Sequence, residues 1–201
     1  MGAARLVLRP GMRPPAAANG RKVAWAVRGD TLRAEDPVVV ARWPPRGAHI
    51  AGENAASMAL EVGEGAGRSL LAADVDSAVE VALATGASFG LLKVAHHGAG
   101  SSSGARALSA FHPRLAAISC GRRNPFGHPD PGALARLAQA GAETHRTDRE
   151  GTLWFEIGPG GATLLDWRSP DFAPIGGAPA SARPAPANGA PGGLARAPAR
   201  W

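Results

Sequence analysis

The sequence of 201 residues has no tyrosine, few lysines and one cysteine. The single cysteine, Cys120, excludes a disulfide framework and a cysteine-based zinc cluster within one chain. A metal site built from this chain therefore has to use histidine and carboxylate ligands.

Long hydrophobic runs are also missing. No stretch approaches the roughly 18 consecutive apolar residues that indicate a membrane span. The segment from Met1 to Pro15 contains arginines and prolines where a signal peptide has its apolar core. We therefore expect neither a membrane span nor an export signal in this chain, and the sequence leaves its cellular location open.

The charge is only mildly positive. The formal net charge is +6, and three arginines, Arg183, Arg196 and Arg200, lie in the Pro/Ala/Gly-rich stretch at the C-terminal end. Subtracting those three leaves about +3 for the rest, which permits contact with phosphate-bearing partners without demanding it. With 45% hydrophobic and 19% charged residues, the composition is that of one globular domain.

The chain divides into three parts. Residues 1–20 form a loose lead-in, residues 21–170 form the folded domain, and residues 171–201 form a disordered tail rich in Pro, Ala and Gly. Within the domain, hydrophobic patterns and turn residues predict strands at 22–28, 37–42, 57–62, 68–72, 90–95, 114–120, 143–147, 152–157 and 162–166, and helices at 76–84, 104–111 and 131–140. Because strands alternate with helices, we expect an α/β layered domain.

Polar residues follow three of these strands directly: Asp74, the pair His96 and His97, and the loop from Asn124 to His128. Strand ends are where α/β folds build their sites, and a carboxylate with imidazoles can converge there on a divalent ion. Each feature also has an ordinary explanation, since an Asp after a strand is most often a helix N-cap and adjacent histidines often only shape a turn.

The sequence around these residues resembles a known family. Five blocks resemble, in the same order along the chain, blocks of the metallo-β-lactamase-like domain at the C-terminus of ComEC family competence proteins. They are NAASMALEV (54–62), SLLAADVDSAVE (69–80), LLKVAHHGAGSSS (91–103), ISCGRRNPFGHP (118–129) and HRTDREGTLWFEI (145–157). The resemblance implies an αββα sandwich, a two-metal hydrolase site with Zn²⁺ or Mn²⁺, and a role in DNA uptake.

The same resemblance implies roles for individual residues. Asp74 takes the place of the metal-bridging aspartate, with Ala73 where the family has glycine, and His96 takes that of a late metal ligand. His97 either joins the metal ligands or reaches a substrate phosphate. His128 matches the GHP histidine, read as a catalytic group that transfers a proton near the metals.

Substrate binding is assigned to the neighbouring loops. Asn124 and Arg122, with Arg123, are placed to bind a phosphodiester through charge-assisted hydrogen bonds, and Ser101 lies in the polar loop after HHG. The ordinary alternatives are a solvated arginine loop and a serine that shapes a turn.

One departure from the family is large. The motif H-x-H-x-D-H, which supplies most metal ligands in the superfamily, is absent, and His49 has no histidine before it. Asp74 and His96 supply two ligands, or three if His97 or His128 turns inward, whereas zinc hydrolases usually have three plus an open position. The alignment places the motif upstream of residue 20, so we expect an incomplete sandwich that lacks its N-terminal part, completed by a partner chain if it is active.

Several functions therefore stay open. The first is a metal-dependent phosphodiesterase or nuclease that acts with the missing half. The second is a catalytically inactive remnant that binds DNA or a protein, and the third is a small-molecule hydrolase such as a lactonase or thioesterase. Cys120 as a nucleophile, with His128 or His145 as its base, is a weaker alternative, because a free cysteine ending an apolar strand is usually just buried. Trp43, Trp154 and Trp167 are candidates for stacking on bases.

Overall fold

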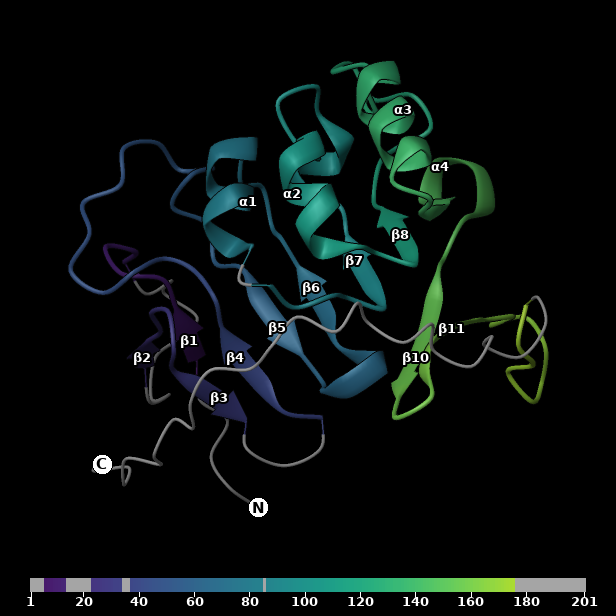
Figure 1. Ribbon diagram of the computed structural model, residues 1–201, viewed down its shortest axis with the longest axis horizontal. Coiled ribbons are helices and arrows are strands. Elements are labelled where there is room, and N and C mark those ends of the chain that lie inside the picture. The colour runs from purple at the N-terminus through teal and green to yellow at the C-terminus, as the bar shows by residue number, and fades with distance from the viewer. Residues whose placement is uncertain (1–5, 14–22, 34–36, 85, 176–201) are drawn as a thin grey trace.

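The computed structural model describes residues 6–13, 23–33, 37–84 and 86–175 (Figure 1). Most of the expected tail, residues 176–201, lies outside the described residues, as does most of the lead-in. The described part is a mixed α/β structure built around a seven-stranded sheet.

The central sheet has the strand order β3-β4-β5-β6-β7-β8-β9. Its strands are β3 (Thr31–Arg33), β4 (Val39–Ala41), β5 (Leu60–Val62), β6 (Ser69–Leu71), β7 (Leu91–Lys93), β8 (Leu115–Ile118) and β9 (Glu143–Arg146). Neighbours from β3 to β6 are antiparallel, whereas those from β6 to β9 are parallel. The parallel half therefore brings the carboxyl ends of four strands to one edge.

Three helices connect the parallel strands and lie side by side along one face of the sheet (Figure 1). They are α1 (Ser77–Leu83), α2 (Ala105–Phe111) and α3 (Pro131–Gln139). The single turn α4 (Thr147–Glu150) follows β9, and the short 3₁₀ segments η2 (Gly65–Gly67) and η3 (Ala95–Gly98) precede β6 and follow β7. The side chains of Asp76 and Asp130 cap α1 and α3 by accepting backbone N–H bonds. Aspartate is favoured at this position because its carboxylate satisfies amides that have no partner within the helix.

Apolar side chains cover both faces of the parallel strands. On the helix face, Leu92 is fully buried in a core shared with Leu70, Phe111 and Leu137. On the other face, Leu91 packs with Leu115 and Ala162 and with side chains of a separate antiparallel hairpin, β10 (Trp154–Gly158) and β11 (Gly161–Leu165). Because successive strand residues point to opposite faces, the run Leu91–Leu92 contributes to both cores.

The termini of the described part contain more structure than we expected. Strand β1 (Leu6–Leu8), in the segment expected to be a loose lead-in, pairs in parallel with β2 (Val23–Trp25). At the other end, the chain continues past the expected boundary at 170, because Ile175 donates a backbone hydrogen bond of 2.8 Å to the carbonyl of Leu164. β3 also falls where the sequence pattern predicted no strand.

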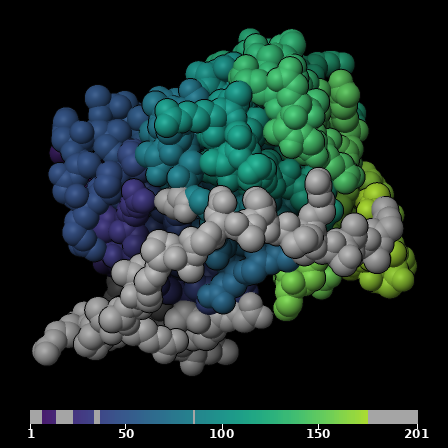
Figure 2. All heavy atoms as spheres, in the orientation of Figure 1, coloured from purple at the N-terminus to yellow at the C-terminus, as the bar shows by residue number. Residues whose placement is uncertain are grey.

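The space-filling view shows the two ends of the molecule. The purple and blue residues of the first strands form the left side, and the yellow residues around β11 form the right side (Figure 2). Among the described residues, no helix is both long enough and apolar enough to cross a membrane.

Candidate functional site at the carboxyl edge of the sheet

Asp74 and the two histidines lie at neighbouring strand ends. Asp74 follows β6, and His96 and His97 lie in η3, which follows β7. β6 and β7 are adjacent and parallel, so the two segments leave the sheet side by side. Ala73, His96 and His97 have φ values of 51°, 46° and 56°. A left-handed conformation is unfavourable for residues with a side chain, and such strain often occurs at functional sites.

The structure brings His97 and Asp74 together. The Nδ1–H of His97 donates a hydrogen bond of 2.6 Å to the carbonyl of Ser119, just after β8. Its other ring nitrogen, Nε2, lies 3.7 Å from Oδ1 of Asp74. Both side chains are nearly half exposed, at 46% and 43%. The backbone carbonyl therefore sets the tautomer and leaves the nitrogen nearest Asp74 free to accept a bond or bind a ligand.

The ring of His96 lies near those of His97 and His128. Its ring centroid is 6.4 Å from that of His97 and 5.7 Å from that of His128. Its Nε2 lies 3.5 Å from the side-chain amide nitrogen of Asn54. We call Asp74, His96, His97 and His128 the histidine cluster.

A distant loop also supports the histidine cluster. Besides the contact of Asn54 with His96, the hydroxyl of Ser57 accepts a bond of 3.3 Å from the backbone N–H of Asp74 and donates to the carbonyl of Asn54. The sequence alone predicted no role for this Asn-x-x-Ser block. Its spacing was the signal, since the amide and the hydroxyl lie three residues apart and reach the same edge.

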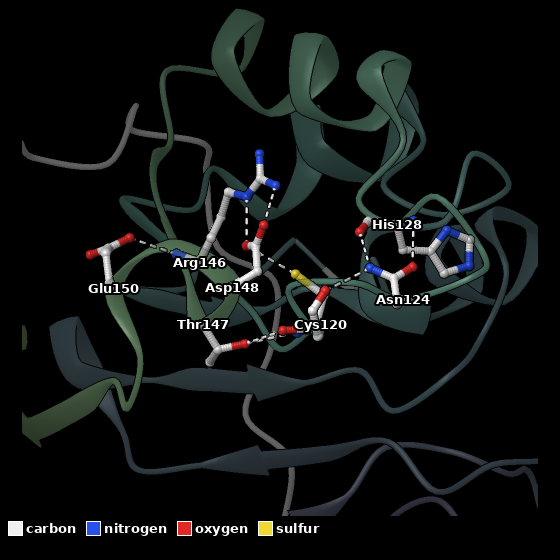
Figure 3. A network of polar contacts seen from close by, with 8 residues as sticks. Cys120, Asn124, His128, Arg146, Thr147, Asp148 and Glu150 are labelled. Carbon is white, nitrogen blue, oxygen red and sulfur yellow. Dashed lines mark hydrogen bonds and ion pairs between the residues drawn. The ribbon is translucent and has the colours of Figure 1, made fainter.

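Asn124 braces the loop that carries His128. Its side chain donates bonds of 2.8 Å and 2.7 Å to the carbonyls of Gly121 and His128, and accepts one of 2.9 Å from the N–H of His128 (Figure 3). Both amide hydrogens are therefore used within the loop. The structure gives Asn124 a positioning role, and contact with a substrate stays a prediction.

The other predicted binding residues are exposed. Arg122 and Arg123 lie on the same loop, and neither forms an ion pair with a described carboxylate. Ser101 is exposed, and its carbonyl accepts a bond of 2.9 Å from the N–H of Ser77 at the start of α1. Its side chain has no hydrogen bond to a described residue, so its assignment to substrate stays a prediction.

The histidine cluster has only part of a metal ligand set. Asp74 and His97 are suited to hold a divalent ion, since a carboxylate and an unprotonated imidazole nitrogen face each other. Across residues 6–13, 23–33, 37–84 and 86–175, however, no group of three or more His, Cys, Asp or Glu side chains is arranged to hold a metal. These residues by themselves do not fit the three-ligand site of a zinc hydrolase.

Two ionisable side chains anchor the loop that follows η3. Arg136 of α3 donates to the backbone carbonyls of Gly100, Ser102 and Ser103 at 2.8–2.9 Å. The carboxylate of Glu80, which is fully buried, accepts a bond of 3.1 Å from the N–H of Gly104. Burial raises the pKa of Glu80 to about 7, although the hydrogen bonds from Gly104 and Ser103 and the charge of Arg136 oppose the shift.

Lys93, which was not among the predicted site residues, is a further group near Asp74. It ends β7, and burial lowers its pKa while the charge of Asp74 partly offsets the shift. A lysine inside an apolar strand run was the available signal.

Cys120 belongs to a second polar cluster, whose polar groups bond to one another (Figure 3). Its thiol donates to Asp148 at 3.2 Å, and Asp148 accepts two bonds from Arg146 at 3.0 Å and 2.7 Å. The hydroxyl of Thr147 accepts from the N–H of Cys120 and donates to its carbonyl, both at 2.8 Å. We call Cys120, Arg146, Thr147 and Asp148 the cysteine network.

The electrostatics of the cysteine network argue against a nucleophilic thiol. Burial and the bond to Asp148 raise the pKa of Cys120, whereas the bonds from Arg146 lower the pKa of Asp148 to about 2. His145, one of the two proposed bases, is instead bonded to Glu143 and Glu150 at 3.1 Å and 2.8 Å. A thiol held in its protonated form is a poor nucleophile.

The three tryptophans considered for base stacking are engaged elsewhere. The indole N–H of Trp43 donates to the carbonyl of Ala55 at 2.6 Å. Trp154 is 51% exposed and packs against Phe172, and the guanidinium of Arg168 lies 4.6 Å from the centre of the Trp167 ring. None of them makes a ring contact with the histidine cluster among the described residues.

Comparison with known proteins gives two relatives and no matching family model. The chain is 33% identical over 115 residues to competence protein ComA of Neisseria gonorrhoeae, covering 54% of this chain and 16% of that protein. It is 35% identical over 65 residues to ComE operon protein 3 of Bacillus subtilis (strain 168), covering 32% of this chain and 8% of that protein. The chain is therefore similar in sequence to competence proteins. Each match spans only a small part of the relative.

Proposed function

We propose that this chain is a metallo-β-lactamase-like domain with a competence-related role, and that it acts on phosphodiester bonds of DNA through a metal site that it only partly supplies. The convergence of the histidine cluster at the carboxyl ends of adjacent parallel strands carries this proposal. The names of the two relatives support the connection with competence.

The layering of the described part is compatible with half of an αββα sandwich. Helices α1 to α3 cover one face of the sheet, and the β10–β11 hairpin packs on the opposite face through Ala162, Phe155 and Ile157. This arrangement supplies a helix layer, a sheet and the start of a second β layer. In the proposal, further strands complete the second layer.

Asp74 and His97 are the two metal ligands that this proposal assigns to the described residues, and His96 takes part only if its ring turns toward them. Zn²⁺ or Mn²⁺ supplies Lewis acidity toward a phosphoryl oxygen when it is bound in such a site. Two ligands are too few, so in this proposal a partner chain supplies the remaining ones.

The side chains around the pair have roles of their own in this proposal. Arg122 and Arg123 bind phosphate through charge-assisted hydrogen bonds. His128, whose ring lies 5.7 Å from that of His96, transfers a proton at the leaving oxygen, because imidazole exchanges protons near neutral pH. Asn124 keeps His128 in place.

A second function is favoured by one observation. Because the described residues contain no three-donor group, the same fold is also suited to a non-catalytic module that binds DNA or a protein. This alternative needs no metal and predicts binding without cleavage.

Metal binding separates the two functions. We would titrate the purified chain with Zn²⁺ and with Mn²⁺ by calorimetry, and compare Asp74→Ala and His97→Asn with His112→Asn. Asparagine removes the imidazole but tolerates the left-handed backbone, which His97 and His112 share, with φ values of 56° and 43°. His112 follows α2, whose end contacts the start of β7 at the opposite edge of the sheet, so it is a matched control.

The hydrolase proposal predicts metal uptake by the wild type and by His112→Asn, weaker than at a complete three-ligand site, and loss of uptake in the two site variants. The absence of uptake by the wild type would overturn it and leave the binding module.

A further inference from the structure

Phe126 is exposed to an unusual degree. It is 77% exposed, the highest value among the large hydrophobic residues that the structure describes as exposed. It lies in the loop that joins β8 to α3, two residues before His128. Packing does not explain an aromatic ring in this position, because most of its apolar surface remains in contact with water.

The loop presents Phe126 in a defined position. The three hydrogen bonds of the Asn124 side chain join the loop on both sides of Phe126, from Gly121 to His128. The Phe126 ring stacks on the His128 ring, with 5.9 Å between centroids and 21° between planes. A line of rings therefore leads from Phe126 through His128 to His96, beside the pair of Asp74 and His97.

The charges of this loop match a polyanion. Arg122 and Arg123 are exposed, come four and three residues before Phe126, and form no ion pair with a described carboxylate. An exposed ring beside unpaired cations is the combination by which proteins bind single-stranded nucleic acid, with stacking for the bases and cations for the phosphates. In a duplex the base faces are covered by their neighbours, so stacking on a protein ring requires unpaired bases.

We propose that Phe126 is a stacking platform for an unpaired nucleobase and that it makes this site selective for single-stranded DNA. The inference rests on the proposed function for its ligand class, but it concerns binding and requires neither metal nor cleavage. A base stacked on Phe126 places the adjoining phosphate near Arg122 and Arg123 and its strand beside His128.

The test is fluorescence anisotropy of the full chain in EDTA with a dye-labelled thymidine oligonucleotide of roughly 16 nucleotides, the upper end of common single-strand site sizes. An oligonucleotide of the same length without bases has the same phosphates, and a duplex has covered bases. Phe126→Ala removes the ring, and Phe126→Trp keeps a stacking surface. Trp25→Ala removes another aromatic ring, 53% exposed, from β2, which pairs with β1 outside the seven-stranded sheet.

We expect Phe126→Ala to weaken binding of the thymidine strand about tenfold, within the range measured for one base–aromatic stack. Binding of the strand without bases should not change, and Phe126→Trp and Trp25→Ala should bind as the wild type does. Tryptophan emission of Phe126→Trp, compared with the wild type, should fall only with the strand that carries bases.

Equal binding of the two strands by the wild type, or equal losses for both strands in Phe126→Ala, would overturn the stacking platform. Wild-type binding that prefers the duplex would do the same. Because the assay is run in EDTA, these results do not depend on whether the chain takes up metal, which tests the proposed function separately.

Discussion

The histidine cluster and the cysteine network lie at the same edge of the sheet but differ in how far their polar groups are satisfied. In the cysteine network, Arg146 and Asp148 are each only 14% exposed, and both are bonded to partners within the network. In the histidine cluster, His97 and Asp74 are 46% and 43% exposed and lie 3.7 Å apart, beyond hydrogen-bond distance.

The difference indicates which of the two clusters can bind a ligand. Both clusters contain residues that perform catalysis in other proteins, and both follow strands of the parallel half. In the cysteine network the donors and acceptors already pair with one another, so it ties the segment after β8 to α4. The histidine cluster keeps a free ring nitrogen and a free carboxylate at its surface, so it can bind a ligand without losing internal bonds.

The largest expected effect concerns Glu80, the buried carboxyl of α1 that bonds to the loop after η3. The pKa of Glu80 is raised from 4.5 to about 7, so the folded state holds a proton that the unfolded state releases. This contribution to stability is complete below about pH 4.5, falls as the pH rises, and is gone above about pH 7. At 1.36 kcal/mol per pKa unit, the loss is about 3 kcal/mol.

Urea unfolding between pH 4.5 and 8 measures this slope, and Glu80→Gln is its control. Glutamine keeps an acceptor for the N–H of Gly104 but does not titrate, so the variant should lose most of the slope. An unchanged slope in Glu80→Gln would show that another group causes the pH dependence and that Glu80 is not the anchor of the loop.

The next effect separates the two clusters directly. Asp148→Ala leaves Arg146 and the thiol of Cys120 without their shared partner, so it should lower the free energy of unfolding by about 2 kcal/mol. Asp148→Asn, which retains an acceptor, should cost less. Denaturant midpoints for both variants check this order, and a loss below about 0.5 kcal/mol in Asp148→Ala would contradict the description of the network as a stabilising one.

A smaller effect is expected in the loop between the two clusters. Asn124→Ala removes three hydrogen bonds in a partly exposed loop and should cost about 1 kcal/mol. Because the loop then no longer holds Phe126 and His128, binding of the thymidine strand should weaken as well. Asn124→Asp keeps the acceptor for the N–H of His128 but turns a carboxylate oxygen toward the carbonyls of Gly121 and His128, so it should lose at least as much. Equal binding by all three proteins would show that the brace does not matter.

The smallest effect is expected in the histidine cluster itself. Asp74→Ala and His97→Asn should each change the free energy of unfolding by no more than about 0.5 kcal/mol, because half-exposed side chains with few bonds contribute little. Thermal unfolding under metal-free conditions checks this. A loss above about 1 kcal/mol would mean that the cluster is structural and would remove the contrast with the cysteine network.

Much of the fold could be predicted from local patterns. The expected strand at 90–95 contains β7, and the expected helix at 131–140 contains α3, with its cap at Asp130 and proline at its first turn. Hydrophobic runs and caps act over a few residues, so a sequence reading detects them. β1 and β3 escaped prediction because their segments show no sustained hydrophobic period, so only pairing with β2 and with β4 defines them as strands.

For the site, the sequence identified the residues but not their contacts. Asp74 and the histidine pair were expected to meet because parallel strands end at one edge. His97, rather than His96, faces Asp74. Its ring is oriented by the left-handed backbone of both histidines in η3 and by its hydrogen bond to the carbonyl of Ser119. The role of Asn124 was likewise hidden, since an amide in a loop reads equally well as a binding group or as a brace.

The sequence by itself determined the alternation of strands and helices, the chemical types at the strand ends and the scarcity of metal donors, because these depend on residue identity and short-range order. Only the tertiary structure decided which polar groups bond to one another and which remain able to bind a ligand. Cys120 meets Asp148 across 28 positions and His96 meets Asn54 across 42, and such contacts depend on how distant segments pack. Available chemistry is what remains after that packing has satisfied the other polar groups.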